Sequence, residues 1–185
     1  MIAEERRPGM RRTATVMVVG ALLLLLGTGV ALAATINCTG GLCQGTNKQD
    51  TLVGTSGPDE INGRGASDTI FGKGADDTLR GDFSSNPAAV EGNDKVVGGA
   101  GEDFLLGEGG NDLLNGGDGN DFIDAKDPSS GSADTANGGR GRDEIESTDR
   151  ERDTIDCGPG ANDTVRFDKR FDTVTNCEHK FPFPQ

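Results

Sequence analysis

The sequence predicts an all-β chain, folded as a solenoid in which short parallel strands from nine-residue units stack on one another. Three regularities support this prediction. An apolar residue recurs every nine positions, an aspartate precedes it by two positions, and in the first run a glycine precedes it by seven. A fixed period of this kind is typical of repeat architectures, in which each unit packs against its neighbours. The apolar residues are Leu52, Ile61, Ile70 and Leu79 in a first run and Val96, Leu105, Leu114 and Ile123 in a second.

The phased aspartates are the candidate functional residues. Around them the glycines become denser in the second run, as in Gly116-Gly117-Asp118-Gly119-Asn120-Asp121. The segment Gly138-Gly139-Arg140-Gly141-Arg142-Asp143 is a further clear copy of the unit. Weaker copies of the unit contain Asp134, Asp153, Asp163 and Asp172.

Each unit divides into a turn and a strand. The glycine-rich half must turn sharply, and glycine reaches a positive φ without strain at Cβ. The other half is extended, so its apolar side chain points inward while the neighbouring side chains point outward. Threonine suits these outward strand positions. The threonines expected there are Thr51, Thr69, Thr78, Thr154, Thr164 and Thr173.

Two units together can form one flattened coil with a strand on each face. Stacking the coils places successive strands about 4.8 Å apart. Each aspartate then lies over the aspartate eighteen residues away, which predicts one column containing Asp50 and Asp68 and a second containing Asp59 and Asp77. Stacked carboxylates repel one another unless a cation lies between them. Ca²⁺ takes six to eight oxygen ligands and fits such turns, whereas Mg²⁺ demands a tighter octahedral geometry. Zinc lacks its usual ligands, since the chain has one histidine, His179.

The repeats resemble the hemolysin-type calcium-binding nonapeptide, G-G-x-G-x-D-x-U-x, of the repeats-in-toxin (RTX) family. The resemblance extends from about Gly45 to Thr175. It implies a right-handed parallel β-roll (a β-solenoid) of stacked nonapeptide pairs, with several Ca²⁺ ions bound between turns. The predicted metal ligands are Asp50, Asp59, Asp68, Asp77, Asp94, Asp103, Asp112, Asp121, Asp134 and Asp143. The out-of-phase residues Asp76, Asp82, Asp118, Asp124 and Asp127 are interpreted as surface charge.

The composition limits the classes of fold and of partner. The 185 residues carry a net charge of −13, contain 30 glycines and are 32% hydrophobic. This charge argues against nucleic acid and anionic lipid as partners, because like charges repel. So little apolar surface with so much charge is typical of disorder, unless a bound cation neutralises the acid. We therefore expect the roll to be largely disordered without Ca²⁺ and to fold on binding it.

Residues 1–33 are typical of a secretory signal peptide. A basic stretch with Arg11 and Arg12 precedes an apolar run from Val16 to Leu26, and small residues follow up to Ala33. Cleavage after Ala33 would leave a secreted, extracellular chain with no membrane span. Translation could start at Met1 or at Met10. The alternative, an uncleaved membrane anchor, is weakened by the glycines within the apolar run.

Two intervals break the repeat. From Leu79 to Val96 there are seventeen residues, one fewer than two units, and the intervening unit has Asn86 in place of the aspartate and Pro87 at the strand position. Four residues are inserted around 128–131. The chain is therefore expected to be either two short rolls or one roll with bulges.

The ends of the repeat region differ from its middle. We expect an N-terminal cap at residues 34–44, the calcium-binding roll at 45–146, a cap of degenerate repeats at 147–178 and a tail at 179–185. Arginine can take the place of a cation beside aspartate in the degenerate repeats. The arginines concerned are Arg150, Arg152, Arg166 and Arg170.

Four cysteines in an exported chain predict two disulfides. Three connectivities are open, and the local one joins Cys38 to Cys43 and Cys157 to Cys177.

No catalytic motif is found in the sequence. One histidine excludes sites that need two, and no G-x-S-x-G nucleophile elbow is present. The prediction is a secreted, non-enzymatic calcium-binding β-roll protein. Two alternatives are kept. The first is an adhesion or matrix-binding module with a cell-surface or polysaccharide partner, in which Ca²⁺ serves only the structure. The second is a cryptic hydrolase.

Overall fold

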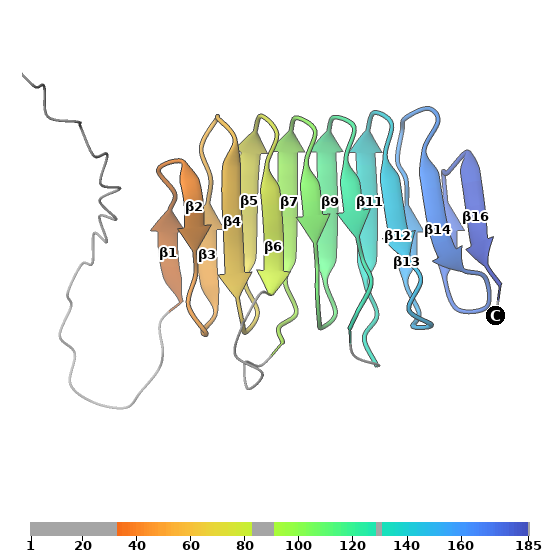
Figure 1. Cartoon of the computed structure of the whole chain (residues 1–185), viewed down its shortest axis with the longest axis horizontal. Helices are drawn as coiled ribbons and strands as arrows, with labels where there is room; N and C mark the ends of the chain where they lie inside the picture. The colour runs from red at the N-terminus through yellow and green to blue at the C-terminus, as the bar shows by residue number, and fades with distance from the viewer. Residues whose placement is uncertain (1–32, 83–90, 129–130, 185) are drawn as a thin grey trace, which may run out of the picture. The chain divides into compact units, whose positions relative to one another are not determined.

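The chain folds into two parallel sheets that face each other. The computed structural model describes residues 33–82, 91–128 and 131–184, and Ala31–Gln185 form one compact unit. In this described part there are sixteen strands and no helix, and each sheet contains eight strands (Figure 1). The predicted all-β solenoid of stacked parallel strands is therefore confirmed. The predicted signal peptide lies almost wholly outside the described residues.

Successive strands alternate between the sheets, so two strands make one coil. One sheet, here sheet A, has the order β1-β3-β5-β7-β9-β11-β13-β15, and sheet B has the order β16-β14-β12-β10-β8-β6-β4-β2. The strands of sheet A are β1 (Ala34–Asn37), β3 (Asp50–Val53), β5 (Thr69–Gly74), β7 (Lys95–Ala100), β9 (Leu113–Asp118), β11 (Thr135–Arg140), β13 (Thr154–Asp156) and β15 (Thr173–Thr175). Those of sheet B are β2 (Gly41–Gln44), β4 (Asp59–Arg64), β6 (Thr78–Asp82), β8 (Phe104–Leu106), β10 (Phe122–Asp124), β12 (Glu144–Ser147), β14 (Thr164–Asp168) and β16 (His179–Phe183).

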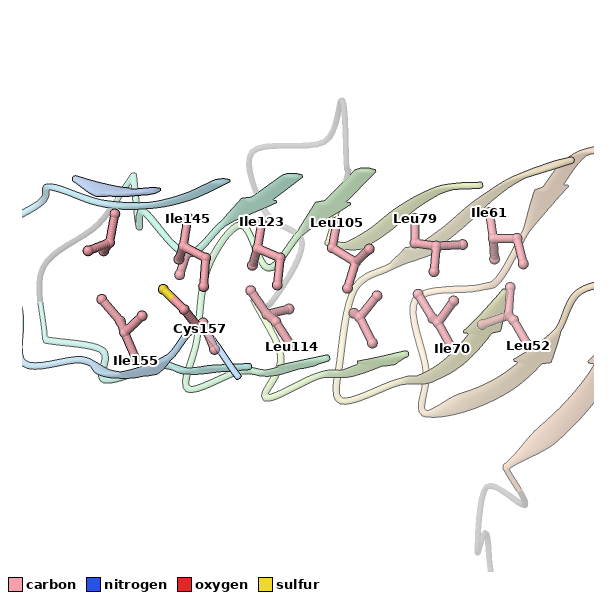
Figure 2. Packing of buried hydrophobic residues seen from close by; sticks show 14 of the residues in the cluster. Leu52, Ile61, Ile70, Leu79, Leu105, Leu114, Ile123, Ile145, Ile155 and Cys157 are labelled. Carbon is pink, nitrogen blue, oxygen red and sulfur yellow. The ribbon is translucent and has the colours of Figure 1, made fainter. Parts of the chain in front are cut away.

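The phased apolar residues form the core. In sheet A, Leu52 pairs in register with Ile70, which pairs with Val96; in sheet B, Ile61 pairs with Leu79. All eight apolar residues of the two runs are fully buried, and the two rows face each other across the interior (Figure 2). The six threonines expected to point outward are all at least partly exposed. The period of nine therefore predicted these eight core residues individually.

Both breaks in the repeat lie within one continuous roll. Strand β5 pairs directly with β7, and β6 pairs directly with β8, across the seventeen-residue interval. Strand β9 likewise pairs directly with β11 across the second insertion. The chain is therefore one roll, and the alternative of two rolls is wrong. Asn86, which stands in place of the ligand aspartate, and Pro87, at the strand position, lie outside the described residues.

The turn glycines serve two different purposes. Gly117 has a φ of 118°, a conformation that favours glycine, as the sequence predicted. Gly116, one residue earlier, is not among the residues with positive φ. A Cβ atom at Gly116 would lie 2.2 Å from Asp121 Oδ2 and 2.5 Å from the carbonyl oxygen of Gly138 in the next coil. At Gly116, glycine is needed because Asp121 and the next coil leave no room for a side chain.

We expect Gly116→Ala to destabilise the roll by about 3 kcal/mol, because the added methyl group must displace either the carboxylate or the next coil. Chemical unfolding at saturating Ca²⁺ measures this change. Gly57→Ala is the matched control: its Cβ would meet only Thr55 Oγ1, at 3.8 Å. The control should change the free energy of unfolding by no more than about 0.5 kcal/mol. Equal effects of the two substitutions would contradict the steric argument.

Two disulfides lie in the first and the last part of the roll. Cys38 is bonded to Cys43 and Cys157 to Cys177, with Cα atoms 5.6 Å and 5.1 Å apart. The local connectivity is therefore confirmed. Cys38 and Cys157 are buried against the apolar core.

Within the described residues, no helix is long and apolar enough to span a membrane.

Candidate metal centre

The phased aspartates form the two predicted columns, one on each edge of the roll where the chain passes between sheets. In each column the backbone N–H of one aspartate donates to Oδ1 of the aspartate in the next coil. In the first column, the donor–acceptor distances are 2.7 Å from Asp50 to Asp68, 2.7 Å from Asp68 to Asp94, 2.8 Å from Asp94 to Asp112 and 2.8 Å from Asp112 to Asp134. In the second column, they are 2.8 Å from Asp59 to Asp77, 2.8 Å from Asp77 to Asp103, 2.9 Å from Asp103 to Asp121 and 2.9 Å from Asp121 to Asp143.

The inserted residues do not interrupt the columns. Asp68 and Asp94 are separated by 26 residues, and Asp112 and Asp134 by 22, yet their hydrogen bonds match the others in the column. The insertions therefore change the number of residues between successive aspartates, but the aspartates still stack one coil apart.

All ten predicted ligand residues are buried, with at most 4% of any of them exposed. From Asp68 to Asp143, Oδ1 of each aspartate accepts the N–H of the aspartate in the preceding coil. In these aspartates the other oxygen, Oδ2, is also buried and has no hydrogen-bond partner among the described residues. These oxygens belong to Asp68, Asp77, Asp94, Asp103, Asp112, Asp121, Asp134 and Asp143. Oδ2 of Asp163, in a weaker repeat, is likewise buried without a partner among the described residues. Buried oxygens without partners carry a large desolvation cost, so this arrangement calls for a ligand that neutralises them.

Burial raises the pKa values of aspartates in both columns. In the absence of an ion, burial raises the pKa of Asp112 to about 9, and the hydrogen bond from the Asp94 N–H opposes this rise only in part. Burial likewise raises the pKa of Asp68 and of Asp134 to about 8, and repulsion from neighbouring carboxylates adds to the effect. The pKa values of Asp94 and Asp121 rise to about 7 for the same reason.

A calcium ion fits this chemistry better than any other common metal. Carboxylate oxygens recur in the stacked turns, and the turns also supply backbone carbonyl oxygens, which are ligands that Ca²⁺ accepts. In the described part of the chain, no group of three His, Cys, Asp or Glu side chains could hold a metal by itself. Any ion between two turns must therefore take several of its ligands from backbone carbonyls.

Residues 44–81, 89–123 and 129–149 match the family model of the RTX calcium-binding nonapeptide repeat, in four copies. The chain belongs to the RTX calcium-binding repeat family. Members of this family bind Ca²⁺, and the match covers most of the two columns. No curated protein and no solved structure matches the chain.

The columns of the RTX roll extend further than the family match. The N–H of Asp134 donates to Asp153 Oδ1 at 2.8 Å, and the N–H of Asp143 donates to Asp163 Oδ1 at 2.8 Å. The second column ends at Glu178, whose Oε2 accepts the N–H of Asp163 at 2.9 Å. The weaker repeats had indicated Asp153 and Asp163, whereas Glu178 occupies no aspartate position and had no sequence signal.

The C-terminal arginines do not take the place of a cation in the columns. Arg166 forms ion pairs with Glu144 and Glu146 on the outer face of sheet B. Among the described ion pairs, none joins Arg150, Arg152, Arg166 or Arg170 to a column aspartate. A hydroxyl acts there instead: Ser147 Oγ donates a hydrogen bond to the column residues, with Oδ2 of Asp153 and of Asp172 both in reach. The expectation that arginine replaces the cation is therefore not supported.

A second, outer ladder runs beside each column, at the position just before the aspartate. Asn93 Oδ1 accepts the N–H of Asn111 at 2.9 Å, and Asn120 Oδ1 accepts the N–H of Arg142 at 2.9 Å. Asp76 Oδ1 accepts the N–H of Glu102 at 2.9 Å. These side chains satisfy backbone groups that the turns would otherwise leave to solvent. In the sequence, the preference of Asn and Asp for turns was the feature that could have indicated this outer ladder.

Asp82 was interpreted as surface charge, and this interpretation is wrong. Only 6% of Asp82 is exposed, and its Oδ2 accepts the N–H of Gly92 at 2.7 Å. Burial raises its pKa to about 6. Asp127 is partly buried, and burial raises its pKa to about 7. Both residues lie beside the inserted segments, where the period of nine gives no guide to burial.

Proposed function

We propose that this chain is a secreted calcium-binding repeat protein in which Ca²⁺ ions between stacked turns drive folding of the roll. The observation that carries the proposal is the set of buried, unpartnered Oδ2 atoms in the two columns. The proposed ligands are the carboxylates of the predicted aspartates together with turn carbonyls. Bound Ca²⁺ supplies the positive charge that these buried carboxylates lack. The chain's own contribution is to hold the carboxylates at the coil spacing and to exclude water from their inner side.

Secretion is supported by two features of the chain. Residues 1–33 have the pattern of a signal peptide, and the four cysteines pair into two disulfides. Disulfides persist in oxidising compartments, outside the cytosol of most cells. The extracellular space also supplies Ca²⁺ at millimolar concentration, within reach of sites of modest affinity such as those of extracellular modules.

Calorimetric titration of residues 34–185 with Ca²⁺ tests the proposed function. The expected result is the binding of several ions per chain. Mg²⁺ at equal concentration should give little heat, because it retains its water and demands octahedral geometry. A stoichiometry near zero for Ca²⁺ would overturn the proposal.

The surface-binding alternative has one specific observation in its favour. A groove of about 760 Å³ lies beside sheet B and the second column. Its lining includes Phe104, Phe122, Asn120, Arg142 and His179 together with the acidic residues Glu102, Asp103, Asp121, Asp143 and Glu144. The rings of Phe104 and Phe122 stack with their centroids 4.9 Å apart, and Phe104 is exposed. Apolar rings beside amide and charged groups would suit a polysaccharide. Retention on cell-wall polysaccharide, compared with and without Ca²⁺, distinguishes this role from calcium binding alone. No observation favours the hydrolase alternative.

A further inference from the structure

The two turns of the first complete coil differ from the turns that follow them. In these two turns, residues 45–50 and 54–59, the aspartate Oδ2 already has hydrogen-bond donors. Thr46 lies within hydrogen-bonding distance of Asp50 Oδ2 through both its backbone N–H, at 2.6 Å, and its hydroxyl, at 2.8 Å. Thr55 approaches Asp59 Oδ2 in the same way, at 2.6 Å and 3.0 Å. From Asp68 to Asp143, the corresponding oxygens of the two columns have no partner among the described residues.

The backbone follows a different path in the two kinds of turn. In most later turns the residue after the first glycine lies in the left-handed region, with φ of 93° at Arg64, 87° at Lys73 and 118° at Gly117; Asp82, beside the seventeen-residue interval, is an exception. Thr46 and Thr55 occupy this position in the first coil and are not among the residues with positive φ. A β-branched side chain is poorly tolerated in the left-handed region. Threonine therefore favours the backbone conformation with negative φ, here called the closed turn, in which its N–H donates to the aspartate Oδ2.

The strain in the later turns points to a ligand. Arg64, Ala66, Lys73 and Ala75 are not glycines, yet all four adopt a positive φ, in two successive turns. Such conformations cost of order 1–3 kcal/mol each and cluster at ligand sites. These turns adopt the left-handed conformation, here called the open turn, even though they lack glycine at these positions. This is expected if a bound ion stabilises the open turn.

We infer that Thr46 and Thr55 replace an ion in the first coil, so that the ion-binding turns of the roll begin at Gly63. This inference rests on the proposed function and narrows its ligand set, since it removes Asp50 and Asp59. The hydrogens of these donors occupy the space that a cation would need at each carboxylate. The single hydroxyl hydrogen of Thr55 is also within reach of the Gly57 carbonyl oxygen, at 3.1 Å, so the Thr55 N–H is the constant donor to Asp59. Thr55 Oγ1 also lies 3.1 Å from the Gly57 N–H, which donates to it, so the hydroxyl oxygen is engaged as well.

The first coil then forms without metal. The Cys38–Cys43 disulfide lies directly before it, and Cys38 packs on the core. Asp59 Oδ1 remains buried without a partner. In later coils the corresponding oxygen accepts the N–H of the preceding aspartate, whereas the register partner of Asp59 in the preceding strand β2 is Gly41.

Counting bound ions in paired variants tests the inference. Native mass spectrometry of residues 34–185 at saturating Ca²⁺ would compare wild type, Asp50→Asn with Asp59→Asn, and Asp103→Asn with Asp112→Asn. The two pairs are matched in chemistry, in position within the unit and in burial. The first pair should keep the wild-type number of ions, and the second should lose ions and need roughly tenfold more Ca²⁺ to fold, about 1.4 kcal/mol. Equal loss of ions from both pairs would overturn the inference.

A gain-of-site variant covers the case in which the first pair fails to fold. Thr46→Gly with Thr55→Gly removes the hydroxyls and permits the left-handed path, while Asp50 and Asp59 stay intact. This variant should bind more ions than wild type, and an unchanged count would contradict the inference. If wild type itself binds no Ca²⁺, the proposed function fails, and that outcome is distinct from any difference among the variants.

Discussion

Adding EGTA to the folded, disulfide-bonded protein at pH 7.5 is expected to remove most of its β-sheet signal in far-ultraviolet circular dichroism. Excess Ca²⁺ should restore that signal. The reason lies in the two columns, where buried carboxylates recur from coil to coil and, from Asp68 to Asp143, their Oδ2 atoms have no donor among the described residues. Without the ion, the roll must either keep these charges buried, take up protons or unfold.

The repulsion within a column is large enough to matter. Two carboxylates about 5 Å apart repel by about 3 kcal/mol at an effective dielectric constant of 20. Each inner aspartate has such a neighbour on both sides, as the chain of hydrogen bonds shows. The total stability of a domain is only about 5–15 kcal/mol. A few unneutralised pairs are therefore enough to unfold the roll.

The controls keep other sources of stability constant. The disulfides stay oxidised throughout, so that only the metal changes. Mg²⁺ added after EGTA should restore much less of the signal than Ca²⁺, because it fits the site poorly. A β-sheet spectrum that is the same in EGTA and in Ca²⁺ would rule out folding on binding.

The parts of the fold that follow from periodicity were predictable from the sequence. A period of nine specified the inward residues from Leu52 to Ile123, and the same period placed the aspartates in two columns. This success has a physical cause. In a solenoid each residue's environment is set by its neighbours one coil away, so that position within the repeat determines burial.

Features that break the period were not predictable in this way. For the seventeen-residue interval the sequence left two short rolls and one bulged roll open, and the direct pairing of β5 with β7 shows that the roll continues with no coil added there. Asp82 lies beside that interval and is buried, although it is out of phase. The role of Gly116 depends on the distance to the next coil, which no local pattern encodes. The hydrogen bonds of Thr46 and Thr55 to their aspartates likewise depend on the turn path.

The pH dependence of stability is expected to have opposite signs with and without Ca²⁺. In the ion-free roll, burial raises the pKa values of Asp112, Asp68 and Asp134 to between about 8 and about 9, whereas an ordinary aspartate has a value near 3.8. The folded, ion-free roll therefore binds more protons than the unfolded chain from about pH 4 to about pH 9. Its stability is greatest at the acid end of this window and falls as the pH rises through the folded-state values.

Calcium reverses this slope because it competes with protons for the same oxygens. Binding requires deprotonated carboxylates, so it releases protons and becomes tighter as the pH rises from about 5.5 to about 8. Thermal melts followed by circular dichroism should therefore show the midpoint rising with pH in Ca²⁺. In EGTA the midpoint should fall from the acid end of this range until little folded signal remains near pH 7.5.

One substitution links the opposite slopes to the columns. Asp112→Asn holds that site neutral at every pH, so it should flatten the slope in EGTA and weaken the stabilisation by Ca²⁺. Asp118→Asn is the control, because Asp118 is exposed outside the columns. Its melts should follow those of wild type in both buffers. Slopes of the same sign in EGTA and in Ca²⁺ would mean that the buried carboxylates do not control folding. Opposite slopes that Asp112→Asn reduces would identify the columns as the groups that protons and Ca²⁺ share.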